Sequence, residues 1–185
     1  MGTGPADEPV REAVRAWIEE FVIGLSLCPF AAEPLHEGRV RFAVSAATTP
    51  AALFDDLMAE LSLLDAVPAS EVETTLLIHP HALLDFADFN RFLDAADVAV
   101  EASGLTGVVQ IASFHPAYVF GDAPADDIAN ATNRSPYPML HLLREASIAR
   151  AVREHGDTKA IPARNAALLR RLGPKGVRAR GGSDF

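Results

Sequence analysis

The sequence predicts an α/β fold: a single domain built on a small, mostly parallel sheet in βαβαβ order, flanked by helices. Two observations lead to this prediction. Short apolar runs of strand length alternate with longer segments whose apolar residues recur every three or four positions, as in amphipathic helices. The connections between successive strands are long enough for right-handed crossovers, which leave the joined strands parallel. A ferredoxin-like α+β arrangement is the alternative.

Eight elements are expected along the chain. In order, they are a helix at 8–27, a strand at 39–44, a helix from Pro50 to just before Pro68, a strand at 74–78, a helix at 83–100, a strand at 108–114, a helix at 138–152 and a short helix at 163–172. A threonine at 48 or 49, followed by proline, gives the second helix its start signal. Pro29, Pro68 and Gly104 end the first three helices. Asp126 or Asp127 is expected to cap a short helical turn.

Size and charge limit the classes of function. The chain has 185 residues, 49% of them hydrophobic, which suits one domain with a buried core. We expect that α/β domain at residues 1–155, followed at 156–185 by a basic C-terminal helix and a flexible tail. The net charge of −9 disfavours nucleic acid as a partner.

Nothing in the sequence indicates a membrane or an export signal. No apolar run reaches the roughly 18 to 20 residues that cross a bilayer. The N-terminus lacks the charged-then-apolar order of a secretory signal. The single cysteine, Cys28, cannot form an internal disulfide and suits a reducing compartment. The sequence therefore predicts a cytoplasmic protein that binds neither membrane nor nucleic acid, and it leaves the oligomeric state open.

Histidines follow two of the predicted strands. His79 and His81 come directly after the strand at 74–78, and His115 follows the strand at 108–114. The carboxyl ends of parallel strands share one edge of a sheet, and ligands favour the crevice at that edge. We therefore expect these histidines to lie together there. The alternative is that the first two are solvated turn residues.

A histidine and a carboxylate lie four residues apart in the helix predicted at 138–152. His141 and Glu145 would project from one face, as a base with its orienting partner or as ligands of a divalent metal. With His115 they form the predicted catalytic set, and with His115 and His79 the candidate ligands for Zn or Fe. No dedicated metal signature such as HExxH is present. The alternative is an ordinary pair on the helix surface.

The polar loop before that helix carries most of the predicted substrate-binding residues. Arg134 lies at the expected helix start, where unpaired backbone amides and the helix dipole favour an anion, and its guanidinium suits a carboxylate or phosphate. The alternative is that Arg134 holds the long loop through carbonyl groups. The candidate substrate-binding residues are Arg134, Asn130, Asn133, Ser135, Tyr137 and Cys28.

Cys28 has two interpretations. It is expected at the C-terminal end of the first helix, where the partial negative charge raises the pKa of a thiol and disfavours the thiolate. That position favours a buried structural cysteine. A nucleophile or a soft metal ligand is the alternative.

Several stretches resemble a known protein family. They are GLSLCPFA at 24–31, the His79-Pro80 step, FHP at 114–116 and, most specifically, NRSPYPMLHLLRE at 133–145. In these stretches the chain resembles the bacterial and plant family catalogued as domain of unknown function 1415, over about residues 11–152. The resemblance implies a single domain of this length with the basic tail outside the shared part. It assigns no activity and no roles to residues.

Two functions of different classes fit these observations. The first is an enzyme for a small anionic metabolite, in which Arg134 holds the anion. His115 and His141 would then act as acid and base, or bind metal with Glu145 in a metal-dependent hydrolase or oxidoreductase. The second is a non-catalytic ligand-binding or protein-interaction module with the polar loop as its docking surface. If the histidines only satisfy structural hydrogen bonds, replacing them costs stability alone.

Overall fold

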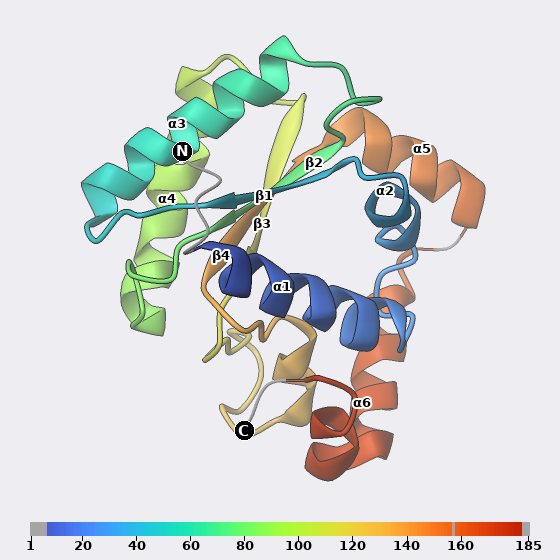
Figure 1. The fold of residues 1–185 in the computed structure, drawn as a ribbon. Helices are drawn as coiled ribbons and strands as arrows, with labels where there is room; N and C mark the ends of the chain where they lie inside the picture. Colours follow the sequence, from blue (N-terminus) through green and yellow to red (C-terminus); the bar gives the residue numbers. More distant parts are fainter. Residues whose placement is uncertain (1–6, 157, 183–185) are drawn as a thin grey trace.

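A computed structural model gives the fold and describes residues 7–156 and 158–182 (Figure 1). The helices are α1 (Glu8–Trp17), η2 (Ile18–Ile23, a π-helix that continues α1), α2 (Ala32–His36), α3 (Pro50–Ala66), α4 (Phe86–Ala102), η3 (Ile128–Thr132, a 3-10 helix), α5 (Glu145–His155) and α6 (Ile161–Arg178). The strands are β1 (Val40–Val44), β2 (Thr74–Ile78), β3 (Val109–Phe114) and β4 (Met139–Arg144).

A four-stranded mixed sheet organises the fold. Its strand order is β1-β2-β4-β3. Strands β1 and β2 are parallel, and β4 is antiparallel to both β2 and β3, so β1, β2 and β3 point the same way, as predicted. The α/β fold is therefore confirmed. The prediction of a mostly parallel sheet is wrong, because two of the three strand pairings involve the antiparallel β4.

The largest difference from the sequence prediction lies at 138–152, which was expected to be one helix. The first part of that segment is the central strand β4, and α5 begins only at Glu145. Leu142 pairs with Thr75 of β2 on one side and with Ile111 of β3 on the other. A strand buried on both faces has a nearly continuous apolar sequence, which resembles a buried helix. His141 therefore lies on a strand, and Glu145 is not its neighbour on a helix face.

Helices cover both faces of the sheet, with α3 above the strands and α1 below them in Figure 1. On the first face, α3 and α4 bury a core that includes Leu53, Leu57, Leu77, Phe89, Phe92, Leu140 and Leu142. On the second face, α1, η2, α2 and α6 bury Trp17, Phe21, Leu35, Leu76, Ile78, Met139 and Leu169. Because side chains alternate along a strand, His141 lies on the second face, beside its cross-strand partners Leu76 and Ala112.

The chain turns sharply after η2, and this turn positions the segment that contains Cys28. The helix predicted at 8–27 is α-helical only to Trp17 and continues as a π-helix. A Cβ on Gly24 would lie 2.2 Å from the carbonyl oxygen of Glu20, so only glycine fits there. The short helix α2, which the sequence did not predict, then follows.

The C-terminal segment is helical further than the sequence indicated. Helix α6 kinks at Gly173 and continues to Arg178, where a flexible tail was predicted, and Val177 is fully buried. Arg170 forms an ion pair with Asp127, which also caps η3 by accepting a hydrogen bond from the Ala129 N–H, as predicted. None of the described helices is long and apolar enough to cross a membrane. Residues 183–185 of the predicted tail lie outside the described residues.

A buried ion pair ties β1 to α3. The Nε and Nη2 groups of Arg41 donate to the two carboxylate oxygens of Glu60 at 2.7 and 2.9 Å, and the Glu60 side chain is 2% exposed. The hydrogen bond to Glu60 raises the pKa of Arg41. A carboxylate buried this deeply depends on its partner, because an unpaired charge in the interior is strongly destabilising.

We expect Arg41→Met to lower the free energy of unfolding by about 2 to 3 kcal/mol, because Glu60 would lose its partner. Adding Glu60→Leu should recover most of that loss, since no buried charge would remain. Urea denaturation measures both effects. Arg91→Met, which removes an exposed pair with Asp88, is the control and should change stability by less than about 0.5 kcal/mol. A wild-type urea midpoint for Arg41→Met would contradict the prediction.

Candidate functional site

A cavity of about 380 Å³ lies on the second face of the sheet. Its floor includes Leu76, Ala112 and His141, which are cross-strand neighbours on β2, β3 and β4. Its walls include Trp17, Ile18 and Val22 of α1 and η2, residues 27–31 before α2, and Ser147, Ile148 and Ala151 of α5. The lining is mostly apolar, and the volume falls in the range of small-molecule sites.

The cavity lies on one face of the sheet rather than in a crevice at the edge where the sequence predicted a site, and it reaches that edge at Phe114, the last residue of β3. It reaches Val40 and Thr74, the first residues of β1 and β2, so it extends toward the amino ends of the parallel strands. The sequence predicted a crevice at their carboxyl ends. That edge is instead covered by the loops that precede α4 and β4, through hydrogen bonds such as the one from the His79 N–H to the Pro138 carbonyl.

Three of the predicted site residues line this one cavity: Cys28, Asn133 and His141. Cys28 comes from the turn before α2, whereas Asn133 and His141 come from one later stretch, the loop after η3 and strand β4. The Nδ2 group of Asn133 donates to the Ser113 carbonyl at 3.1 Å, which fixes the amide against the end of β3. The structure therefore brings together three of the predicted site residues, but around the cavity on the second face rather than around His115 and Arg134.

His141 contributes an uncharged imidazole to the cavity floor. Its ring lies 6.2 Å from that of Phe114, centroid to centroid. Among the described residues, no group forms a hydrogen bond with this imidazole. Burial lowers the pKa of His141 to about 4, because an imidazolium would lose its hydration there. At neutral pH the ring therefore offers one N–H donor and one nitrogen acceptor.

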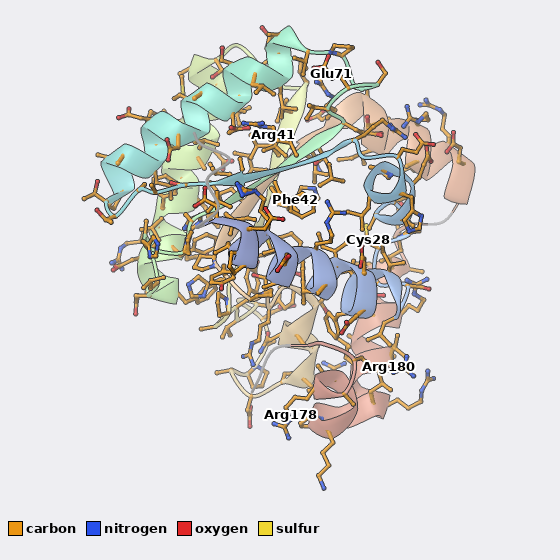
Figure 2. The ribbon with its side chains drawn as sticks, in the orientation of Figure 1. Cys28, Arg41, Phe42, Glu71, Arg178 and Arg180 are labelled. Atoms are coloured by element: carbon orange, nitrogen blue, oxygen red, sulfur yellow. The ribbon has the colours of Figure 1, made fainter. Side chains whose placement is uncertain are left out.

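Cys28 also lines the cavity and contributes a thiol, which Figure 2 shows close to α2. Burial raises its pKa, and hydrogen bonds from the backbone of Phe30 and Ala31 offset part of that rise. The sequence also predicted a raised pKa for this thiol, but the main cause is desolvation by burial rather than the negative end of a helix. The group is therefore a neutral thiol at pH 7.

A network of ion pairs closes one side of the cavity. Glu73, just before β2, is 5% exposed and pairs with Arg39 and with Arg150 of α5, the latter at 2.6 Å. Arg39 also pairs with Glu33 at 2.8 Å. This network was not predicted from the sequence. A glutamate beside an apolar strand was the available signal, because a buried carboxylate needs a cationic partner.

The remaining predicted histidines lie on the other face of the sheet. The rings of His79 and His115 both contact Phe89 of α4, at 5.7 and 5.1 Å between centroids. His115 is 1% exposed, its Nδ1 accepts the Ala117 N–H at 3.0 Å, and its Nε2 lies 3.2 Å from the Leu83 carbonyl oxygen. The prediction that these two histidines lie together is correct. The prediction that His115 and His141 share one hollow is wrong, because β3 and β4 present them on opposite faces.

The proposed metal set is not assembled. His79 and His115 lie near each other, but His141 is across the sheet and Glu145 does not line the cavity. Within residues 7–156 and 158–182, no three His, Cys, Asp or Glu side chains form a group that could hold a metal ion. The Zn or Fe site predicted from these four residues therefore has no support in the fold.

Arg134 and its neighbours hold the long loop together. Arg134 is 7% exposed, and its Nε and Nη2 donate to the carbonyls of Tyr118 and Ala125, each at 3.0 Å. This is the structural alternative considered for that arginine. The premise of an anion site at a helix start is wrong, because a strand follows. Asn130 likewise bonds to loop backbone, Ser135 donates to the Tyr137 carbonyl, and Tyr137 packs against the core of the second face.

Comparison with known families now agrees with the resemblance seen in the sequence. A family model described as "Protein of unknown function (DUF1415)" matches residues 9–179. The chain belongs to this family. The match extends through α6, so the expectation that the basic C-terminal segment lies outside the shared region is wrong. No curated protein and no solved structure gives a significant match.

The stretches that carry the DUF1415 resemblance border the cavity from two sides. Residues 24–31 supply the wall with Cys28, and residues 133–145 supply Asn133 and His141. The apolar part of the remaining lining, such as Trp17 and Ala112, has no sequence signal, because an apolar residue that borders a cavity looks like any core residue.

We expect this DUF1415 protein to lose stability below pH 6.5 through His79. Burial lowers the pKa of His79 from 6.5 to about 4. Between these values the unfolded chain binds the proton and the folded chain does not, so stability falls as pH falls. His79 alone should account for about 3 kcal/mol across that window. His141, with a pKa lowered to a similar value, adds a loss of the same sign.

Urea unfolding between pH 4 and pH 7.5 tests this expectation. His79→Gln should show a flatter dependence on pH than the wild type, whatever its stability at pH 7.5. His36→Gln, at an exposed position, is the matched control and should keep the wild-type slope. Equal slopes for His79→Gln and the wild type would contradict the assignment.

Proposed function

We propose that this protein binds a small, largely apolar molecule in the cavity bordered by the sheet, η2, α2 and α5. The observation that carries the proposal is the cavity itself, about 380 Å³ with a mostly apolar lining and a few polar groups. Such a hollow suits burial of an apolar ligand, with the polar groups fixing its orientation. This proposal corresponds to the second function inferred from the sequence, a non-catalytic ligand-binding module.

The electrostatics of the lining favour binding over nucleophilic catalysis. Cys28 has a raised pKa and His141 a lowered one, both mainly through burial. A catalytic thiolate and imidazolium pair requires shifts in the opposite directions. The resting cavity therefore presents a neutral thiol and a neutral imidazole.

The fold offers less support for an enzyme that acts on an anionic metabolite through Arg134. The guanidinium of that residue is engaged by two loop carbonyls. His115 and His141, the proposed acid and base, lie on opposite faces of the sheet. Two arginines line the cavity: Arg150 is already paired with Glu73, and Arg144 donates to the carbonyls of Val67 and Val72.

We expect the uncharged fluorescent probe N-phenyl-1-naphthylamine to bind in the cavity, with enhanced emission. Ala112→Phe should weaken this binding at least about tenfold, because the added ring would occupy the floor beside His141. Val98→Phe adds the same ring on the exposed side of α4 and is the control. Fluorescence titration measures both. Wild-type affinity in a folded Ala112→Phe variant would contradict a cavity site.

We expect the Cys28 thiol to react slowly with iodoacetamide at pH 7.5, more slowly than glutathione, because its raised pKa leaves little thiolate. Saturating N-phenyl-1-naphthylamine should slow the reaction further by covering the sulfur. Intact-protein mass spectrometry follows the reaction directly, since the chain has a single cysteine. An unchanged rate with bound probe would place the probe elsewhere.

A further inference from the structure

The cavity floor holds a hydrogen-bonding group that the protein leaves unused. The His141 imidazole lies on the central strand with Leu76 and Ala112 on either side. Its ring contact with Phe114 is apolar, and none of the described residues donates to it or accepts from it. An unpaired polar group within an apolar lining costs free energy unless something binds it. A bound molecule could supply the missing partner.

A second unpaired N–H, on Trp17, is enclosed by protein beside the cavity. The indole N–H of Trp17 is buried and has no hydrogen-bond acceptor in the described part of the chain. Its ring meets that of Phe114 edge to face at 5.6 Å, so Trp17, Phe114 and His141 form a continuous run of rings. A ligand in the cavity would meet the His141 ring and not this enclosed indole nitrogen. An unpaired N–H is rarer in protein interiors than an unpaired acceptor, so an acceptor on the ligand is favoured over a donor.

Most of the charged side chains that line the cavity already have partners among the described residues. Glu73 is shared between Arg39 and Arg150, as described above. The guanidinium of Arg144 donates to the carbonyls of Val67 and Val72 at the end of α3. A carboxylate on a ligand would therefore compete with Glu73 for Arg150 and with the two carbonyls for Arg144, so burying its charge in the apolar lining is costly.

We propose that the cavity selects an uncharged ligand whose apolar body carries a carbonyl-type oxygen, and that the His141 N–H donates a hydrogen bond to this oxygen. The inference rests on the proposed function and adds the class of ligand. Carboxylates of the same size, such as fatty or aromatic acids, are disfavoured. Hydrocarbons of the same size fit the cavity but leave His141 unpaired.

Three two-ring probes of matched shape test this inference on the full chain at pH 7.5. They are 2-acetylnaphthalene, with a carbonyl acceptor, 2-ethylnaphthalene, with none, and 2-naphthoate, with a charge. Displacement of N-phenyl-1-naphthylamine gives their affinities. We expect 2-acetylnaphthalene to bind about 3- to 10-fold more tightly than 2-ethylnaphthalene, the effect of one hydrogen bond. Binding of 2-naphthoate should be at least about 100-fold weaker than that of 2-acetylnaphthalene.

His141 variants assign the discrimination to one side chain. His141→Leu should reverse the preference and bind 2-ethylnaphthalene more tightly than 2-acetylnaphthalene, because the ketone oxygen would then be buried without a donor. His141→Gln, which keeps an N–H donor, should restore part of the preference. His36→Leu, at an exposed position, is the control and should match the wild type.

The outcomes separate this inference from the proposed function. Equal wild-type affinities for 2-acetylnaphthalene and 2-ethylnaphthalene would overturn the inference and leave cavity binding intact. So would tight binding of 2-naphthoate. Failure of N-phenyl-1-naphthylamine and all three matched probes to bind would contradict the proposed function, and the inference with it.

Discussion

The fold depends on the pairing of β4 between β2 and β3. An interior strand in this position satisfies its backbone N–H and C=O groups on both sides, so the two flanking strands are held together through it. The same strand separates the two helical layers and carries His141 to the middle of one face. Without β4, the segments that supply Leu76 and Ala112 would not flank a common floor.

One consequence is that the sheet separates histidines that look alike in sequence. His79 and His115 lie under α4, where the ring of each has a backbone carbonyl partner and contacts Phe89. Those contacts are typical of structural histidines. His141 is also kept neutral by burial, but it faces a cavity and has no such partner among the residues that the structure describes. His141 therefore differs from His79 and His115 in its hydrogen-bond partners and not in the direction of its pKa shift.

Local signals predicted much of the fold. Thr49 caps α3 and Asp127 caps η3, because a side-chain oxygen beside free backbone amides acts over a few residues. The common direction of β1, β2 and β3 followed from the length of their connections. The prediction of one helix at 138–152 was wrong because Leu140, Leu142 and Leu143 suit a helix and a central strand equally well. The predicted anion site at Arg134 depended on the same helix. Because a strand follows Arg134 instead, no helix start is present there to favour an anion.

The sequence by itself determined the elements whose signals are local: the caps, most of the helices, the three parallel strands and the family to which the chain belongs. It also pointed to Cys28, Asn133 and His141, although as parts of a different site. Only the tertiary structure decided that these three share a cavity and that His115 does not. The physical reason is that strand pairing and packing act between distant segments, and an apolar run contains no information about which partner it will pair with.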